Sequence, residues 1–236
     1  MASAPKVART RARARPGNAP AQRAYNTGMT EHVILLHGVW MRGLTLFSLA
    51  RRLRAAGFSV DVFDYASVFG DADATYERLR VRMREANSDR VHLVGHSLGG
   101  ILALEATRRR RDLPRGHIVC LGPPLRGSSV ARLLSGLPGG RWLLGANHGA
   151  LVEGIAHWDG SRPVGVVAGQ MPFGLGVSIG ALTAPHDGTV AVEETRLNGL
   201  ADHCTVDATH TGMLFSSTVA ELTIGFLRNG RFAPTR

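Results

Sequence analysis

The sequence predicts an α/β fold, with a mostly parallel sheet of about six strands and helices on both faces. From Met29 onward, short apolar runs alternate with stretches whose apolar residues recur at helical spacing, the pattern of successive βαβ units. With 236 residues, 44% of them hydrophobic, the chain can also bury a substantial core. These features predict one folded domain over residues 29–236.

The first elements follow from local patterns. Residues 32–36 predict the first strand, and residues 44–56 place their apolar side chains on one helical face. Gly57 stands where the C-terminal cap of that helix belongs, and residues 58–63 predict the second strand. Asp73 is a candidate N-cap for a helix that extends to about residue 86.

The later elements repeat this alternation. Residues 91–95 form a buried apolar run that predicts the third strand, and a helix follows to about residue 110. Further strands are expected at 117–121, 164–168 and near 203–207, and further helices near 190–200 and 215–228.

A long insert, residues 122–163, separates the fourth and fifth predicted strands. It contains paired prolines, scattered glycines and apolar helical patches at 130–134 and 143–144. A connection of this length with apolar stretches of its own is more typical of a lid or cap than of a plain loop. We therefore expect a cap-like insert after the fourth strand.

The net charge of +10 is concentrated in the first 28 residues. They contain Lys6 and five arginines but no acidic residue, so the other residues carry only +4. The first 28 residues are also rich in Ala, Arg and Pro, and we expect a disordered basic N-terminal extension there. For the folded domain over residues 29–236 we expect no nucleic-acid partner.

Two interpretations of this extension stay open. It is either an arm that contacts nucleic acid or an anionic membrane, or non-functional sequence upstream of a start at Met29. We favour the second, because the first strand begins almost directly after Met29. The extension lacks the apolar segment of a secretory signal.

The two cysteines, Cys120 and Cys204, are too few for a disulfide framework. Both fall in apolar segments, so we expect buried free thiols, which favour a reducing, cytoplasmic location. No run approaches 18 consecutive apolar residues, so no transmembrane helix is expected. The sequence does not determine the oligomeric state.

The motif Gly95-His96-Ser97-Leu98-Gly99 lies between a predicted buried strand and a predicted helix. A serine on such a sharp turn has a strained backbone, and only small neighbours fit beside it. The turn raises the hydroxyl above the sheet, at the positive end of the following helix. We therefore predict Ser97 as a nucleophile.

A serine nucleophile needs a base, and the base needs an acid that orients it. In this strand-turn-helix arrangement the partners follow in the order acid, then histidine, each just beyond a later strand. Asp187 lies in a turn-forming stretch after the fifth strand, and His210 directly follows the last one. We predict these two residues as the acid and the base.

Other residues compete for both roles. The rival bases are His186 beside the acid, His203 at the start of the last strand, and His148 and His157 in the insert; the rival acids are Asp64, Asp202 and Asp207. Most of these lie at the wrong end of a strand or in the insert, so Asp187 and His210 remain the preferred pair.

An oxyanion hole requires two backbone N–H groups. We expect them from Leu98, directly after the nucleophile, and from Val39, in the loop after the first strand. His37 is interpreted as shaping that loop. Trp40 and Met41 are candidates for the substrate pocket.

The four arginines at 108–111 suggest a phosphate or nucleic-acid site. They also fall at the C-terminal end of a predicted helix, where cations complement the helix dipole and face solvent. We favour this second interpretation. The chain has neither Cys/His metal spacing nor a Gly-rich phosphate loop, so we expect no metal and no cofactor.

Together these motifs resemble the α/β-hydrolase superfamily, over residues 30 to 227. The C-terminal part is similar to compact bacterial lipases, in which Asp187-x-x-Val190, Leu197-x-Gly199, His210-x-x-x-Leu214 and Ser217-x-Val219 recur in that order. The resemblance implies the α/β-hydrolase fold, Ser97, Asp187 and His210 as the catalytic triad, and Val39 and Leu98 as oxyanion donors.

The expected function is therefore a lipase-like serine esterase that hydrolyses carboxylic esters with a hydrophobic acyl group. Its substrate would be a small-molecule ester or a lipid. A thioesterase or an acyltransferase would use the same residues. The alternative from another class is a catalytically inactive hydrolase fold that binds nucleic acid or membrane through its basic arm, and a complete triad argues against it.

Overall fold

The computed structural model describes residues 31–174 and 180–232. The basic extension expected over residues 1–28 lies outside the described residues. Within the described ranges, no helix is both long enough and apolar enough to cross a membrane.

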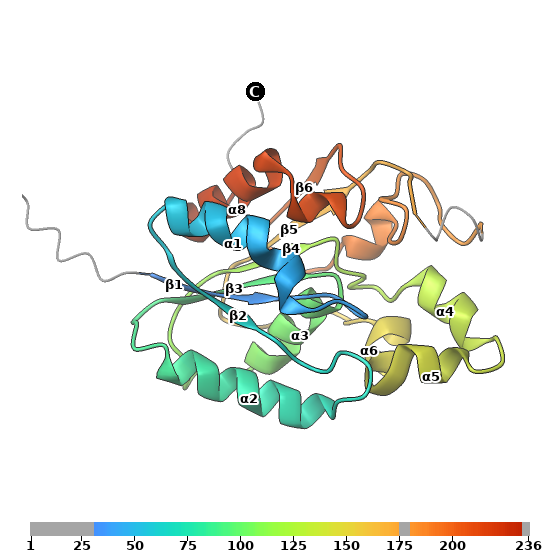
Figure 1. The fold of residues 1–236 in the computed structure, drawn as a ribbon, viewed down its shortest axis with the longest axis horizontal. Coiled ribbons are helices and arrows are strands. Elements are labelled where there is room, and N and C mark those ends of the chain that lie inside the picture. The colour runs from blue at the N-terminus through green and yellow to red at the C-terminus, as the bar shows by residue number, and fades with distance from the viewer. Residues whose placement is uncertain (1–30, 175–179, 233–236) are drawn as a thin grey trace, which may run out of the picture.

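Within the described part of the chain, six parallel strands form one sheet in the order β2-β1-β3-β4-β5-β6 (Figure 1). The strands are β1 (His32–Leu36), β2 (Ser59–Phe63), β3 (Val91–His96), β4 (Ile118–Leu121), β5 (Val164–Gly169) and β6 (Asp202–Val206). This confirms the predicted fold class, and every neighbouring pair of strands is parallel. The strand order reverses between β1 and β3, and sites in such sheets lie beyond the carboxyl ends of the strands at this point.

Two pairs of helices cover the two faces of the sheet, as predicted. Helices α1 (Phe47–Ala55) and α8 (Ser217–Asn229) lie on one face, and α2 (Ala72–Glu85) and α3 (Leu98–Thr107) on the other (Figure 1). The first pair buries Leu49, Leu53, Phe226 and Leu227, and the second pair buries Leu79, Met83, Ile101 and Leu102. The sheet is therefore the middle of three layers.

The N-terminal end of α2 differs from the sequence prediction, because Asp71 and not Asp73 is the N-cap. Asp71 has the extended backbone that an N-cap needs, and its Oδ1 accepts a hydrogen bond from Ala74 N–H at 2.7 Å. Asp73 lies inside the first turn, where its charge still favours the positive end of the helix.

Two other helix predictions also need correction. The helix expected at 190–200 is wrong, because only the short 3₁₀ turn η3 (Val192–Thr195) forms there. Glu194 in this turn is buried and accepts hydrogen bonds from Ala191 N–H and from Ser129 N–H of the insert. Helix α3 ends at Thr107, before the expected residue 110, because the backbone becomes extended at the next residue.

The insert between β4 and β5 contains three short helices, α4 (Ser129–Ser135), α5 (Gly140–Leu144) and α6 (His148–Glu153). They gather at the end of the sheet where the strands have their carboxyl ends, at the right of Figure 1. The side chain of Asn147 donates to the carbonyl oxygen of Ser67, in the loop after β2, at 2.8 Å. The insert is thus bonded to the loop after β2, at the carboxyl edge of the sheet.

Candidate active site

Ser97, the predicted nucleophile, stands on the turn between β3 and α3. Its backbone adopts φ 55° and ψ −121°, a strained conformation for a residue other than glycine. The Ser97 N–H donates to the carbonyl oxygen of Leu121 in β4 at 2.8 Å, which fastens the turn to the next strand. The turn places the hydroxyl at the carboxyl edge of the sheet, beside the positive end of α3.

The two glycines of the motif allow this turn to pack closely. A Cβ atom at Gly95 would lie 2.3 Å from the carbonyl carbon and oxygen of Gly99. A Cβ atom at Gly99 would lie 2.6 Å from the carbonyl oxygen of Leu36 in β1. Because these neighbours are backbone atoms, neither position can hold a side chain without moving the strand or the turn.

Asp187 and His210 are in direct contact. His210 Nδ1–H donates to Asp187 Oδ2 at 2.6 Å, and the other carboxylate oxygen accepts the N–H groups of Thr189 and Val190 at 2.9 and 2.8 Å. Asp187 is only 1% exposed. The carboxylate is therefore fixed by three hydrogen bonds, and it holds the His210 ring through Nδ1, as the acid of a triad would.

Ser97 and the His210 ring flank the same piece of backbone at the end of β4. Ser97 is bonded to Leu121, and a Cβ atom at the next residue, Gly122, would lie 3.1 Å from His210 Nδ1. The described hydrogen bonds of the ring include none to the Ser97 hydroxyl. In unliganded enzymes such bonds are often long and tighten when substrate binds.

The loop after β1 packs directly on the Ser97 turn. A Cβ atom at Gly38 would lie 3.2 Å from Ser97 Cβ. The N–H groups of Val39, in this loop, and of Leu98 donate to no other described residue. Two unpaired donors therefore lie on the two segments that meet at the serine, which is the arrangement an oxyanion hole needs.

His37 is wholly buried and belongs to the framework of this loop. Its Nδ1–H donates to the carbonyl oxygen of Gly38 at 2.9 Å, and its ring stacks on Tyr65 at 4.2 Å. Asp64 lies 3.0 Å from Nε2, and the Tyr65 hydroxyl donates to the His37 carbonyl oxygen at 2.5 Å. These contacts hold the loop on the segment that directly follows β2.

The predicted pocket residues Trp40 and Met41 line a cavity of about 180 Å³ beside this loop. Met41 Sδ would lie 3.2 Å from a Cβ atom at Gly38, so the cavity adjoins the serine turn. Phe69, another lining residue, contacts Trp40 at 6.1 Å and Trp142 of the insert at 5.6 Å between ring centroids. The Trp40 indole also donates to the carbonyl oxygen of Leu143 at 3.1 Å.

The rival residues make other contacts. His186 Nδ1 accepts from Gly188 N–H, His203 bonds to Thr195, and His157 lies 3.9 Å from Asp159; Asp64 contacts His37, Asp202 accepts from Phe232 N–H, and Asp207 accepts from Gln170. Among the described residues, none of them is bonded to the side chain of His210 or Asp187.

The sequence reasoning missed one neighbour of the candidate base, His96. Its Nε2–H donates to the carbonyl oxygen of His210 at 2.9 Å, and the two rings lie 4.6 Å apart. Burial, together with repulsion from the His210 ring when that ring is protonated, lowers the pKa of His96 to about 3, so the His96 ring is neutral. Its place at the end of β3, directly before Ser97, was the only signal in the sequence.

Comparison with known proteins finds a match to the model of the alpha/beta hydrolase family over residues 33–178, which is more than half of the chain. A comparison with curated protein sequences gives no match.

Solved structures of similar fold include three hydrolases. The Bacillus licheniformis lipase BlEst2 in propeptide form matches with a TM-score of 0.74 and 18% identity, over 89% of this chain and 52% of the lipase. A metagenomic carboxyl esterase matches with a TM-score of 0.62 and 13% identity, over 78% and 65% of the two chains. The pyrethroid hydrolase PytH matches with a TM-score of 0.60 and 15% identity, over 85% and 98%. This chain thus spans about half the length of the first structure.

Proposed function

The chain belongs to the alpha/beta hydrolase family, and on this basis we propose that it is a serine esterase that hydrolyses carboxylic esters with a hydrophobic acyl group. Ser97 is the nucleophile, His210 the general base and acid, and Asp187 the residue that orients His210. The observation that carries the proposal is the 2.6 Å contact between Asp187 and His210, next to a serine with a strained backbone.

In the acylation step the Ser97 hydroxyl oxygen attacks the carbonyl carbon of the ester, and His210 Nε2 takes the hydroxyl proton. The negative charge that develops on the carbonyl oxygen is stabilised by the N–H groups of Val39 and Leu98. When the tetrahedral intermediate collapses, the bond to the alcohol breaks, and His210 returns the proton to the departing alkoxide. An acyl group remains on Ser97.

Water then removes the acyl group by the same route in reverse. His210 accepts a proton from the water, the hydroxide attacks the acyl carbon, and Ser97 leaves with the proton from His210. Asp187 stabilises the imidazolium that forms twice in each cycle. The proposed chemistry balances with one water consumed and with one acid and one alcohol released.

The cavity at Trp40 and Met41, in the loop that packs on the serine turn, supports the preference for a hydrophobic acyl group. Its walls include Trp40, Met41, Val68 and Phe69, and most of this lining is carbon. Burial of an apolar chain against such walls contributes about 25 cal/mol per Å² of apolar surface.

The two described cysteines support the cytoplasmic location that we propose. Cys120 and Cys204 are both free thiols, Cys120 is buried as expected, and Cys204 is half-buried. Free thiols of this kind persist in a reducing compartment.

An ester series tests the proposed function. The purified chain is assayed with p-nitrophenyl esters from acetate to decanoate, together with Ser97→Ala and the matched variant Ser161→Ala at the opposite edge of the sheet. We expect hydrolysis by the parent chain and by Ser161→Ala, and a loss of about 10⁴-fold or more in kcat for Ser97→Ala. No hydrolysis of any ester or thioester by the parent chain would favour an inactive hydrolase fold instead.

A further inference from the structure

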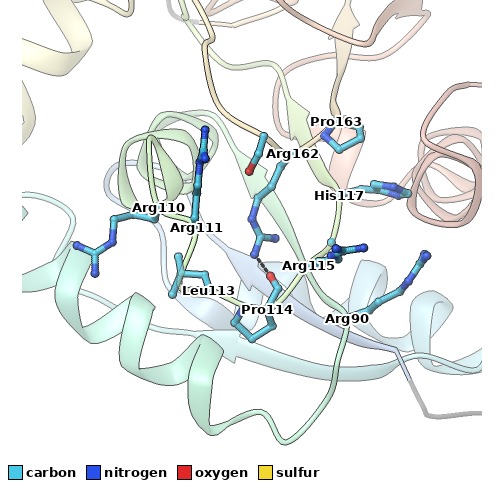
Figure 2. A pocket seen from close by; sticks show the side chains of 11 residues that line it. Arg90, Arg110, Arg111, Leu113, Pro114, Arg115, His117, Arg162 and Pro163 are labelled. Carbon is cyan, nitrogen blue, oxygen red and sulfur yellow. Dashed lines mark hydrogen bonds between the residues drawn. The ribbon is translucent and has the colours of Figure 1, made fainter.

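Another pocket lies at the amino edge of the sheet, at the opposite end of the strands from Ser97 (Figure 2). Its walls come from the segments that lead into β3, β4 and β5, and its volume is about 510 Å³. The six residues of β3 separate it from the serine turn by about 20 Å, at roughly 3.3 Å per residue. The pocket is therefore distinct from the candidate active site.

Five arginines and no carboxylate line this pocket. Two of them pair with carboxylates that do not line the pocket: Arg90 lies 3.4 Å from Glu31, and Arg110 lies 2.9 Å from Asp112. The other three, Arg111, Arg115 and Arg162, form no ion pair with any residue in the described ranges. The pocket thus concentrates positive charge on one concave surface.

Arg162 is the most unusual of these residues, because it is a buried cation with only 6% of its surface exposed. Its guanidinium donates to the carbonyl oxygens of Val91, at 2.9 Å, and of Pro114. Burial lowers the pKa of Arg162 to about 10, so the group still carries its charge at neutral pH. A buried charge is costly unless an opposite charge accompanies it, and neutral carbonyl groups supply only part of that compensation.

The cluster of arginines at 108–111 also has a different environment from the one its sequence suggests. Since α3 ends at Thr107 and Arg109 has a left-handed backbone (φ 54°), the later arginines lie on the loop that leads to β4. In Figure 2, Arg110 and Arg111 stand on one side of Arg162, and Arg115 and Arg90 stand on the other. Two of the four arginines therefore line the pocket and do not continue the helix.

We propose that this pocket binds a small molecule that carries two or more phosphate groups, such as inorganic pyrophosphate or the diphosphate part of a nucleotide. Guanidinium groups match phosphate oxygens with paired N–H donors, and several of them around one cavity favour a ligand with several negative charges. Three chain segments line the pocket, and its volume of about 510 Å³ suits a compact ligand more than a nucleic-acid strand. None of its lining residues is an exposed large apolar side chain of the kind that enters a membrane.

Isothermal titration of the full chain with pyrophosphate tests the proposal. The test variants are Arg111→Gln, Arg115→Gln and the double variant, and the control is Arg51→Gln, an exposed arginine on α1. We expect saturable binding at one site, weakened about tenfold by each test substitution and about a hundredfold by both. Arg51→Gln removes the same charge and should change the affinity by less than about twofold. The basic residues 1–28 are present in every variant.

Three results would overturn the proposal: no saturable binding of pyrophosphate, equal weakening by Arg51→Gln and the test variants, or tighter binding of a single-stranded oligonucleotide or of phosphatidic acid vesicles at the same arginines. The substituted arginines are exposed, so each variant should fold as the parent chain does. Thermal melting of each variant verifies this. Hydrolysis of p-nitrophenyl esters should be the same in all of them. The titration measures pyrophosphate binding and not hydrolysis, so a chain without esterase activity would leave the outcome of this binding test unchanged.

Discussion

His210 and Asp187 are joined by two hydrogen bonds, one between their side chains and one between their backbones. The side-chain bond measures 2.6 Å, and the His210 N–H donates to the Asp187 carbonyl oxygen at 2.9 Å. The loops after β5 and β6 are thereby bonded to each other at the same two residues that the chemistry would use. The ring and the carboxylate are held in position before any substrate arrives, which reduces the reorganisation that catalysis requires.

Replacement of Asp187 by Asn should lower kcat for p-nitrophenyl esters by about 10⁴-fold, because the amide cannot hold the same tautomer of His210 or stabilise the imidazolium. The matched variant is Asp207→Asn, at an exposed carboxylate that accepts from Gln170 at 2.6 Å. It should retain kcat within about twofold, since surface substitutions of this kind have small effects. A larger loss of kcat in the Asp207 variant than in the Asp187 variant would contradict the assignment of Asp187 as the acid.

Replacement of Gly99 by Ala should destabilise the protein by about 2 kcal/mol or more, as expected for a side chain forced against backbone atoms. The new Cβ would lie 2.6 Å from the carbonyl oxygen of Leu36 and 2.7 Å from that of His37. The control is Gly225→Ala in the middle of α8, where a Cβ meets no atom within 4 Å. That change should raise the free energy of unfolding by about 0.5–1 kcal/mol. Urea unfolding measures both, and equal effects would contradict the close packing of the serine turn.

Replacement of Phe69 by Ala should change the preference among esters. This ring lines the cavity next to Met41 and lies between Trp40 and Trp142. We expect kcat/KM to fall about tenfold for octanoate esters and to stay nearly constant for acetate, because only the longer chain reaches the lost apolar surface. Val81→Ala on α2, also an exposed apolar position, serves as the control. Equal losses for both esters would place the acyl chain elsewhere.

The stability of the protein should fall as the pH drops from about 6.5 toward 3. The pKa of His96 is lowered to about 3 by burial first and by the charge of His210 second, and burial also lowers the pKa of His92 to about 3. In the unfolded chain these rings take up protons near their ordinary pKa, so the unfolded state binds more protons across this range. Each ring then contributes a slope of about 1.4 kcal/mol per pH unit.

The variant His96→Gln isolates this contribution. A glutamine amide can still donate to the carbonyl oxygen of His210 but does not titrate. We expect the slope of the unfolding free energy between pH 6 and 4 to decrease by about 1.4 kcal/mol per pH unit. Urea unfolding at pH 7, 6, 5 and 4 measures the slope, and identical slopes in both proteins would show that His96 is protonated in the folded state.

Much of the fold could be predicted because its signals are local. The strands are short apolar runs, and five consecutive residues indicate the turn at Ser97. Gly95 and Gly99 of this motif are required because backbone atoms lie where their side chains would be. Asp187 and His210 were found by their order along the chain and by their places after strands. The contact between them at 2.6 Å supports this assignment.

The features that the sequence did not indicate depend on residues far apart in the chain. The segment expected as a helix near residue 195 is a short 3₁₀ turn, in which Glu194 accepts a hydrogen bond from Ser129 N–H, 65 residues earlier. The carbonyl oxygen of His210 accepts from His96, 114 residues earlier. The arginine pocket combines residues from three connections, including Arg162, whose burial no local pattern reveals. Periodicity and capping signals contain no information about such distant pairs.

The central claim is that Ser97 is the nucleophile, and covalent labelling tests it most directly. A p-nitrophenyl alkylphosphonate reacts with an activated serine, so that an O–P bond forms and p-nitrophenolate leaves. After incubation with the full chain, mass spectrometry of the intact protein and of its peptides should show one phosphonyl group, located on Ser97, and none in Ser97→Ala. A phosphonyl group on another residue, or an unlabelled Ser97→Ala variant that still hydrolyses p-nitrophenyl esters at the parent rate, would contradict the account.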